Sequence, residues 1–217
     1  EKLIDEKIRN ILRLMYRLHM LGEEERKPGS YNTPEHRDAV LEAARESVVL
    51  LKNDRQILPL SPEKTKRVLV VGDNANRIHS SGGGSAEIKA LYEITPLMGI
   101  KKLLGGNAEV TFAQGYLADD LPTETGGLNW QADSLEDGGK AAAESKEENY
   151  ALQRKSEELR DEAVRLAGEY DTVIFVGGQN HMQDLEGRDR EDMKLPYGQD
   201  VLIEALLEAN PDTILVL

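Results

Sequence analysis

The stretch 66-KRVLVVGDNAN-76 joins a run of aliphatic and β-branched residues to a glycine and a polar turn. This pattern predicts a buried strand that ends at Gly72. The stretch 171-DTVIFVGG-178 has the same form and predicts a second buried strand. Further strands are expected at 108–115 and 212–217, with helices at 96–106, 147–169 and 198–211. Strands that alternate with helices predict an α/β fold with a mostly parallel sheet flanked by helices, an α/β sandwich.

Two of the loops that follow these strands are long and unusual in composition. Loop 72–85 ends in three consecutive glycines and Ser85, and loop 177–196 carries eight charged residues between Asp184 and Lys194. The carboxyl ends of parallel strands meet at one edge of a sheet, where ligands usually bind. We therefore expect the two loops to share one edge and to form the candidate site.

The composition excludes several classes of protein. The chain has 217 residues and a formal net charge of −13, which disfavours binding to nucleic-acid phosphates or to an anionic membrane. It contains no cysteine, so disulfides, thiol catalysis and cysteine metal sites are excluded. The glycine triplet lacks the spacing of a phosphate-binding loop, and the four histidines lack metal-binding spacing. The sequence thus predicts no metal and no cofactor.

Glu186 is the candidate catalytic carboxylate of the charged loop. The residue after it is Gly187, which lets the backbone turn and a substrate come close. A general acid needs a carboxyl pKa near neutrality, whereas Arg188 and Arg190 would lower the pKa unless they pair with neighbouring aspartates. The residues alone leave two readings open, a solvated loop carboxylate and a catalytic acid, and the first is the more common.

Other groups in the two loops allow similar alternatives. His79 and His181 suit contacts with sugar hydroxyls, although a solvated or structural histidine is the commoner case. The glycine triplet is either a flexible turn or a backbone held against a ligand or a partner surface.

The N-terminal part of the chain differs from the rest. Residues 1–22 predict an amphipathic helical arm, and residues 23–36 predict a linker rich in charge, glycine and proline. The apolar face of the arm consists of Ile4, Ile8, Ile11, Met15 and Leu18. The α/β domain then covers 37–217, with a polar insertion at 116–146. The chain lacks an initiator Met and stops within a predicted strand, so we expect a piece of a longer protein.

Several separate segments, in order, resemble the second domain of glycoside hydrolase family 3, the β-glucosidase family. They are ARESVVLLKNDRQILPLS (44–61), VGDNANRIHSSGGGSAEIKALYEITPLMGI (71–100), TFAQGY (111–116) and NHMQDLEGRDREDMKLPYGQDVLIEALLEANPDTILVL (180–217). The resemblance begins near Arg37, and the insertion is poorly matched. The first helix resembles the last helix of the barrel domain that precedes this domain in the family.

This resemblance implies roles for particular residues. In the family, a (β/α)₈ barrel supplies the aspartate nucleophile, and the α/β sandwich that follows supplies the acid/base glutamate. The family motif EG-x-DR-x-x-M-x-LP reads EGRDREDMKLP here, which assigns the acid/base role to Glu186. The family's GGGS loop matches Gly82–Ser85 and lies near the active site. We therefore expect the substrate contacts to come from His79, His181, Gly83 and Ser85, with no metal.

One departure from the family limits the predicted activity. The nucleophile motif, Ser-Asp-Trp or a near variant, is absent, and Trp130 stands in a different context. The resemblance thus implies a fragment of a retaining, β-glucosidase-like hydrolase, exo-acting on terminal β-D-glycosyl residues and inactive without the nucleophile domain. Its expected partners are a β-glucoside or oligosaccharide, the barrel domain and, through the exposed helix face, a second copy of the chain.

Two other functions stay open at this point. The chain is alternatively a non-catalytic carbohydrate-binding or interaction α/β module, although such a module would not need a barrel-like first helix. A nucleotide-binding α/β domain is weakened by the lack of a phosphate-binding motif. The identity of the sugar, its linkage, the oligomeric state and the compartment are not fixed by the sequence.

Overall fold

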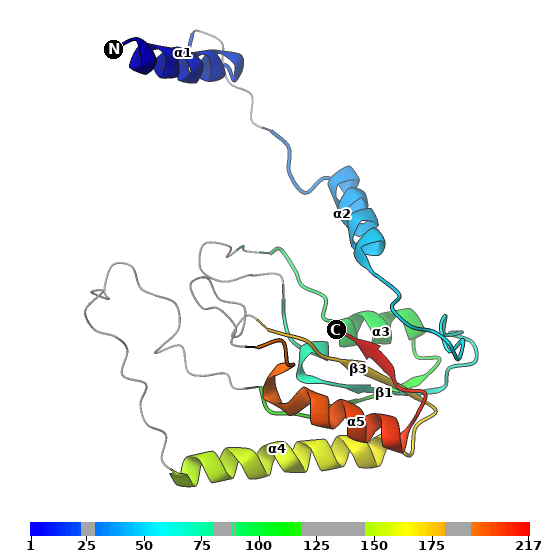
Figure 1. Ribbon diagram of the computed structural model, residues 1–217. Helices are drawn as coiled ribbons and strands as arrows, with labels where there is room; N and C mark the ends of the chain where they lie inside the picture. The colour runs from blue at the N-terminus through cyan, green and yellow to red at the C-terminus, as the bar shows by residue number, and fades with distance from the viewer. Residues whose placement is uncertain (23–28, 80–87, 89, 119–145, 181–191) are drawn as a thin grey trace. The chain divides into compact units, whose positions relative to one another are not determined.

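The computed structural model describes residues 1–22, 29–79, 88, 90–118, 146–180 and 192–217 (Figure 1). The chain divides into two compact units, Glu1–Asp54 and Arg55–Leu217, which are described separately. Most of the predicted insertion 116–146 and part of the predicted linker 23–36 lie outside the described residues. The predicted domain bounds therefore stay predictions.

The second unit contains a parallel sheet in the order β2-β1-β3-β4. Its strands are β1 Arg67–Val71, β2 Glu109–Ala113, β3 Thr172–Val176 and β4 Ile214–Val216. In the register, Val68 stands opposite both Val110 of β2 and Thr172 of β3. The α/β architecture with a mostly parallel sheet, predicted from the alternation of strands and helices, is confirmed.

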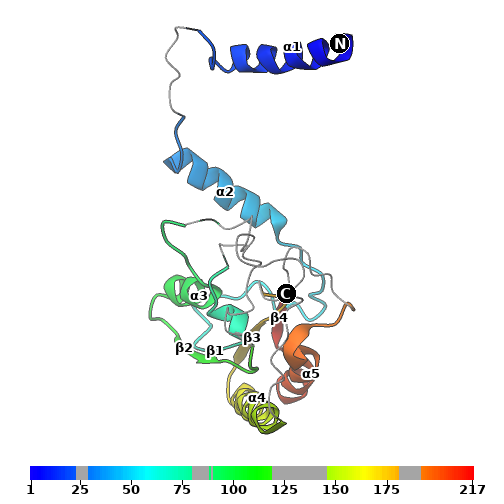
Figure 2. The same cartoon turned by 90° about the vertical axis from the view of Figure 1, so that its left-hand side faces the viewer.

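Helices cover both faces of this sheet, and the side chains of β1 show why. Val68 and Val70 point to one face, where α3 (Pro96–Leu104) contributes buried Leu97 and Leu104. Leu69 and Val71 point to the other face, against α4 (Lys146–Ala167) and α5 (Gln199–Ala209). Figure 2 shows α3 on one side of the sheet and the two longer helices on the other. The side chains of Val68–Val71 are all fully buried, so both faces require apolar residues.

Packing is tight where α5 crosses the end of β1. Leu202 of α5 is 1% exposed and lies over Gly115, just after β2. A Cβ at Gly115 would come within 2.9 Å of Leu202 Cδ2 and 2.8 Å of Val71 Cγ1. The position therefore requires glycine, because the neighbouring side chains occupy the space.

The first unit contains two helices, α1 (Lys2–Arg17) and α2 (Pro34–Ser47). The Thr33 hydroxyl accepts a hydrogen bond from the His36 N–H at 3.3 Å, and Pro34 occupies the first turn, so α2 begins with a standard cap. No residue of α1 is buried, and Ile4, Ile8 and Ile11 are exposed. What covers this apolar face stays a prediction. None of the helices in the described part of the chain has the length and apolar content of a membrane span.

The burial of Leu202 gives a test of the core. Leu202→Ala should lower the free energy of unfolding by about 2–5 kcal/mol, because it leaves a cavity beside Gly115 and Val71. Val201→Ala is the matched control on the same helix, since Val201 is 54% exposed; it should change stability by less than about 0.5 kcal/mol. Urea unfolding of the two variants measures the difference. Equal losses would contradict the position of α5 on the sheet.

Candidate functional site

The carboxyl ends of β1 and β3 lie side by side and close together. Gly72, directly after β1, adopts φ 114°, and its N–H donates to the Ala113 carbonyl at 3.1 Å. A Cβ at Gly72 would collide with the backbone carbonyl of Val176 at the end of β3. Glycine is therefore required for both its backbone conformation and this close approach. The two predicted loops leave the sheet at this one edge.

Asp73 is the carboxylate nearest the end of β1, and its oxygens are already engaged. The Arg77 Nε donates to Asp73 Oδ2 at 2.6 Å, and both side chains are mostly buried. The Gln114 amide donates to the other oxygen, Oδ1, at 3.2 Å. Asp73 therefore joins the ends of β1 and β2 and is poorly placed to act as a proton donor.

Asn74 joins the end of β1 to the chain that follows β3. Its side chain is 4% exposed, and its amide nitrogen donates to the carbonyls of Gly177 at 2.9 Å and of Gln179 at 3.1 Å. Its backbone N–H points to the Tyr116 hydroxyl at 3.4 Å. Both hydrogens of the side-chain amide are thus used to hold the start of the charged loop.

Gln199, the first residue of α5, holds the same segment from the other side. Its side chain is fully buried, and it exchanges two hydrogen bonds of 2.8 Å with the N–H and the carbonyl of Gly178. A Cβ at Gly177 would meet both Phe175 and Gln199 Oε1. Gly177, Gly178 and Gln179, the first residues of loop 177–196, are therefore each bound by the side chain of Asn74 or Gln199.

Two tyrosines complete this arrangement. Tyr116 and Tyr197 stack with ring centroids 6.1 Å apart and nearly parallel planes, and the Tyr197 hydroxyl lies 3.4 Å from Asn180 Oδ1. Burial, with a smaller contribution from the charge of Asp73, raises the pKa of Tyr116 to about 12. The Tyr116 phenol therefore stays protonated near neutral pH, which suits a structural hydroxyl.

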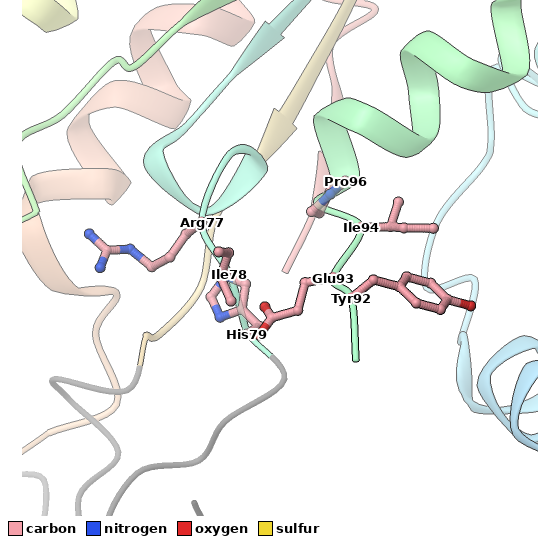
Figure 3. Close-up of a pocket in the computed structure, with 7 residues that line it drawn as sticks. All are labelled: Arg77, Ile78, His79, Tyr92, Glu93, Ile94 and Pro96. Atoms are coloured by element: carbon pink, nitrogen blue, oxygen red, sulfur yellow. The ribbon is translucent and has the colours of Figure 1, made fainter. Parts of the chain in front are cut away.

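A pocket of about 380 Å³ opens beside this edge, between the chain after β1 and the start of α3 (Figure 3). It is lined by Arg77, Ile78, His79, Tyr92, Glu93, Ile94 and Pro96. In Figure 3 the Glu93 side chain extends toward His79, whereas the Arg77 guanidinium points away from it. The lining thus combines apolar side chains with polar groups from two segments of the chain.

The predicted site residues fall into two groups. His79 lies in the described chain, is exposed and lines this pocket. Glu186, His181, Gly83 and Ser85 lie outside the described residues, so their roles stay predictions. Within the described ranges no group of three histidines or carboxylates could hold a metal ion.

Sequence reasoning missed Asn74, Gln199, Tyr116 and Tyr197. The predicted polar insertion begins at Tyr116, yet Tyr116 is only 2% exposed. The sequence does contain one indication of the contact between these segments. Asn74 and Gln179–Asn180 each follow a predicted buried strand by a few residues. A parallel sheet brings such residues to the same edge.

Comparisons with known proteins identify the family. The profile of the glycosyl hydrolase family 3 C-terminal domain matches residues 48–217. The β-glucosidase BoGH3A of Bacteroides ovatus is 38% identical over 224 residues, covering 100% of this chain and 26% of that protein. The probable β-glucosidase I of Aspergillus clavatus is 43% identical over 124 residues, covering 56% of this chain and 14% of that protein. The chain thus spans about a quarter, or less, of the length of these relatives.

A solved structure supports the same fold. The β-glucosidase of Kluyveromyces marxianus superposes with a TM-score of 0.67 at 21% identity, over 97% of this chain and 38% of that one. At this identity the likeness bears on the fold alone. The family resemblance stated from the quoted segments is confirmed by the family profile and the curated relatives. The chain belongs to the glycosyl hydrolase family 3 C-terminal domain family.

Proposed function

We propose that this chain is the acid/base domain of a retaining, β-glucosidase-like glycoside hydrolase that acts on terminal β-D-glycosyl residues. The observation that carries the proposal is the edge of the sheet where the loops after β1 and β3 begin together. Asn74 bonds the start of one loop to the start of the other. A loop that delivers a catalytic group needs such a fixed origin, since reacting atoms must be positioned within a fraction of an ångström.

In this proposal Glu186 is the general acid and base. It protonates the glycosidic oxygen while a nucleophile attacks the anomeric carbon, which releases the aglycone and leaves a glycosyl-enzyme. The carboxylate of Glu186 then takes a proton from water as that water attacks the intermediate. The nucleophile is an aspartate of a partner barrel domain, and in retaining enzymes the two carboxyl groups stand about 5 Å apart.

Two other groups at this edge, Asp73 and Tyr116, are poorly suited to transfer a proton, which supports Glu186 in this role. Asp73 already accepts hydrogen bonds from Arg77 and Gln114. The pKa of Tyr116, raised to about 12, keeps the phenol protonated and unable to act as a base. The edge thus supplies a rigid support, and the proton-transfer group has to come from the loops.

Substrate contacts are proposed for the two loops. His79 lines the pocket beside the edge and is exposed, so its imidazole can reach a sugar hydroxyl. His181 follows directly on the bound segment that ends at Asn180. Gly83 and Ser85 would contribute backbone N–H groups and a hydroxyl at close range, because the glycine triplet has no side chains to obstruct a ligand.

The alternative is a non-catalytic carbohydrate-binding or interaction module. It would bind sugars through the same pocket without a nucleophile. Calorimetric titration of the isolated chain with β-linked oligosaccharides separates the two functions. Tight binding by the chain alone favours the module, whereas sugar binding that needs the barrel domain favours the catalytic domain.

The isolated chain should be inactive on aryl β-glucosides. No nucleophile motif is present, and the acid/base carboxyl alone cannot form the glycosyl-enzyme. Release of nitrophenol from the purified chain, followed by absorbance, tests this. Activity that persists in Glu186→Gln marks a contaminating enzyme, whereas activity that disappears in Glu186→Gln contradicts the prediction.

In the chain joined to its barrel domain, Glu186→Ala should lower kcat/KM for poor leaving groups by roughly 10²–10⁴-fold. A dinitrophenyl glucoside needs little protonation, so formation of its glycosyl-enzyme should suffer least. Hydrolysis of that intermediate should then limit turnover, and azide should restore it by attacking without a general base. The product should be the β-glycosyl azide, because the second displacement restores the configuration.

Asp192→Asn is the matched control for a loop carboxylate. Asp192 is exposed, accepts from the Lys194 N–H at 3.0 Å and has the Lys194 ammonium 3.7 Å away, so it is a solvated turn residue. Its substitution should leave the leaving-group series unchanged. If Glu186→Ala behaves like Asp192→Asn and does not respond to azide, Glu186 is not the acid/base.

A further inference from the structure

Side chains from distant parts of the chain bind the first four residues of loop 177–196. Every residue of the segment Gly177–Asn180 has a specific partner. The Gly177 N–H donates to the Val216 carbonyl at 2.9 Å, which continues the pairing of β3 with β4. The other bonds come from side chains outside the sheet ladder, namely those of Asn74, Gln199 and Tyr197.

The returning end of the loop meets the same segment. The chain re-enters the described structure at Asp192 and reaches Tyr197 and Gly198, which both adopt positive φ, just before α5. Tyr197 lies against Asn180 through its hydroxyl, and Gln199 bonds to Gly178. The residues just before position 181 and just after position 191 are therefore hydrogen-bonded to each other.

The burial of two amide side chains here needs an explanation. Asn74 and Gln199 are 4% and 0% exposed, and burying a polar side chain is unfavourable unless its hydrogen bonds are satisfied. Gln199 and the apolar side chain of Phe175 both lie beside Gly177. What only the amides provide is directional bonding to backbone atoms of residues 177–179.

We propose that Asn74 and Gln199 are positioning residues for the carboxyl group of Glu186. They fix the point and the direction in which the chain leaves β3, and they act through the backbone without touching the substrate. Five residues lie between Asn180 and Glu186, so the Cα atoms of these two residues can be at most about 20–22 Å apart. The inference rests on the proposed acid/base role of Glu186.

The mechanism gives this anchor a specific effect. Proton donation requires the acid to be within hydrogen-bond reach of the leaving oxygen, and an error of 1 Å in position can cost about 10²-fold in rate. A loosened anchor should therefore weaken acid and base assistance while leaving nucleophilic attack intact. Loosening the anchor should therefore lower kcat/KM mainly for poor leaving groups, as Glu186→Ala does but to a smaller extent. It should not lower the activity on all substrates equally.

The test is Asn74→Leu in the chain joined to its barrel domain. Leucine is similar in size to asparagine but donates no hydrogen bond to Gly177 or Gln179. We expect kcat/KM to fall about 10–100-fold for an alkyl or phenyl β-glucoside and only about 2–3-fold for the dinitrophenyl glucoside. Azide should partly restore turnover of the dinitrophenyl substrate.

Asn210→Leu is the matched control at the opposite edge of the sheet. The Asn210 amide also donates to two backbone carbonyls, those of Ala167 at 3.2 Å and Tyr170 at 2.9 Å, and it lies before β4. Its loss should lower the melting temperature about as much as that of Asn74 but leave the leaving-group dependence unchanged. If the two variants show the same uniform loss of activity, Asn74 has only a structural role and the inference is wrong.

Gln199→Met and Tyr197→Phe keep the inference testable if Asn74→Leu does not fold. Gln199→Met should show the same selective loss, and Tyr197→Phe a smaller one, since it removes the 3.4 Å contact with Asn180 and keeps the ring stack. Leaving-group profiles parallel to wild type in both would overturn the inference.

Glu186→Ala, measured alongside, separates the two proposals. If kcat/KM depends strongly on the leaving group in Glu186→Ala but not in the variants of Asn74, Gln199 and Tyr197, only the positioning role is rejected. If Glu186→Ala shows no such dependence, the acid/base role and the positioning role are both rejected.

Discussion

The candidate site depends on how closely β1 and β3 approach at their carboxyl ends. Gly72 makes this possible, because any side chain there would collide with the Val176 carbonyl. The turn after Gly72 then brings Asn74 within hydrogen-bond reach of Gly177 and Gln179. The same approach allows Gly72 to bond to the end of β2. One glycine thus sets the distances among three strand ends, and the side chains that hold the loops are placed by those distances.

The two edges of the sheet use similar chemistry for different purposes. At the amino edge, Asn210 and Thr213 bond to carbonyls that end α4 and α5, which completes helix termini. At the carboxyl edge, Asn74 and Gln199 bond to a segment that belongs to neither a helix nor a strand. At that edge Asp73 already accepts a hydrogen bond from Arg77, and the Tyr116 phenol remains protonated. The edge therefore serves as a support, and in the proposed function the reactive groups come from the loops and from a partner domain.

The sequence was sufficient for the fold but not for the details of the site. Short runs such as VLVV and TVIFV predict buried strands, because β-branched residues are common in strands of a sheet that is covered on both faces. The parallel topology predicts that the loops after β1 and β3 share the carboxyl edge of the sheet. The family motif around Glu186 predicts the acid/base role of that residue. The roles of Asn74 and Tyr116 did not follow, because their partners lie 103 and 42 residues away. A polar residue after a strand suggests a solvated turn unless the partner across the sheet is known.

The long separation between Asn74 and Gly177 has a consequence for the order of folding. Bringing residues 103 positions apart into contact costs chain entropy, and that cost is met only once β1 and β3 have paired. Asn74 can bond to this segment only after the central strands have docked, so we expect its bonds to form late in folding. Contacts of that kind slow unfolding more than they speed folding. Removing the Asn74 bonds should therefore speed unfolding of the unit Arg55–Leu217 more than it slows its folding.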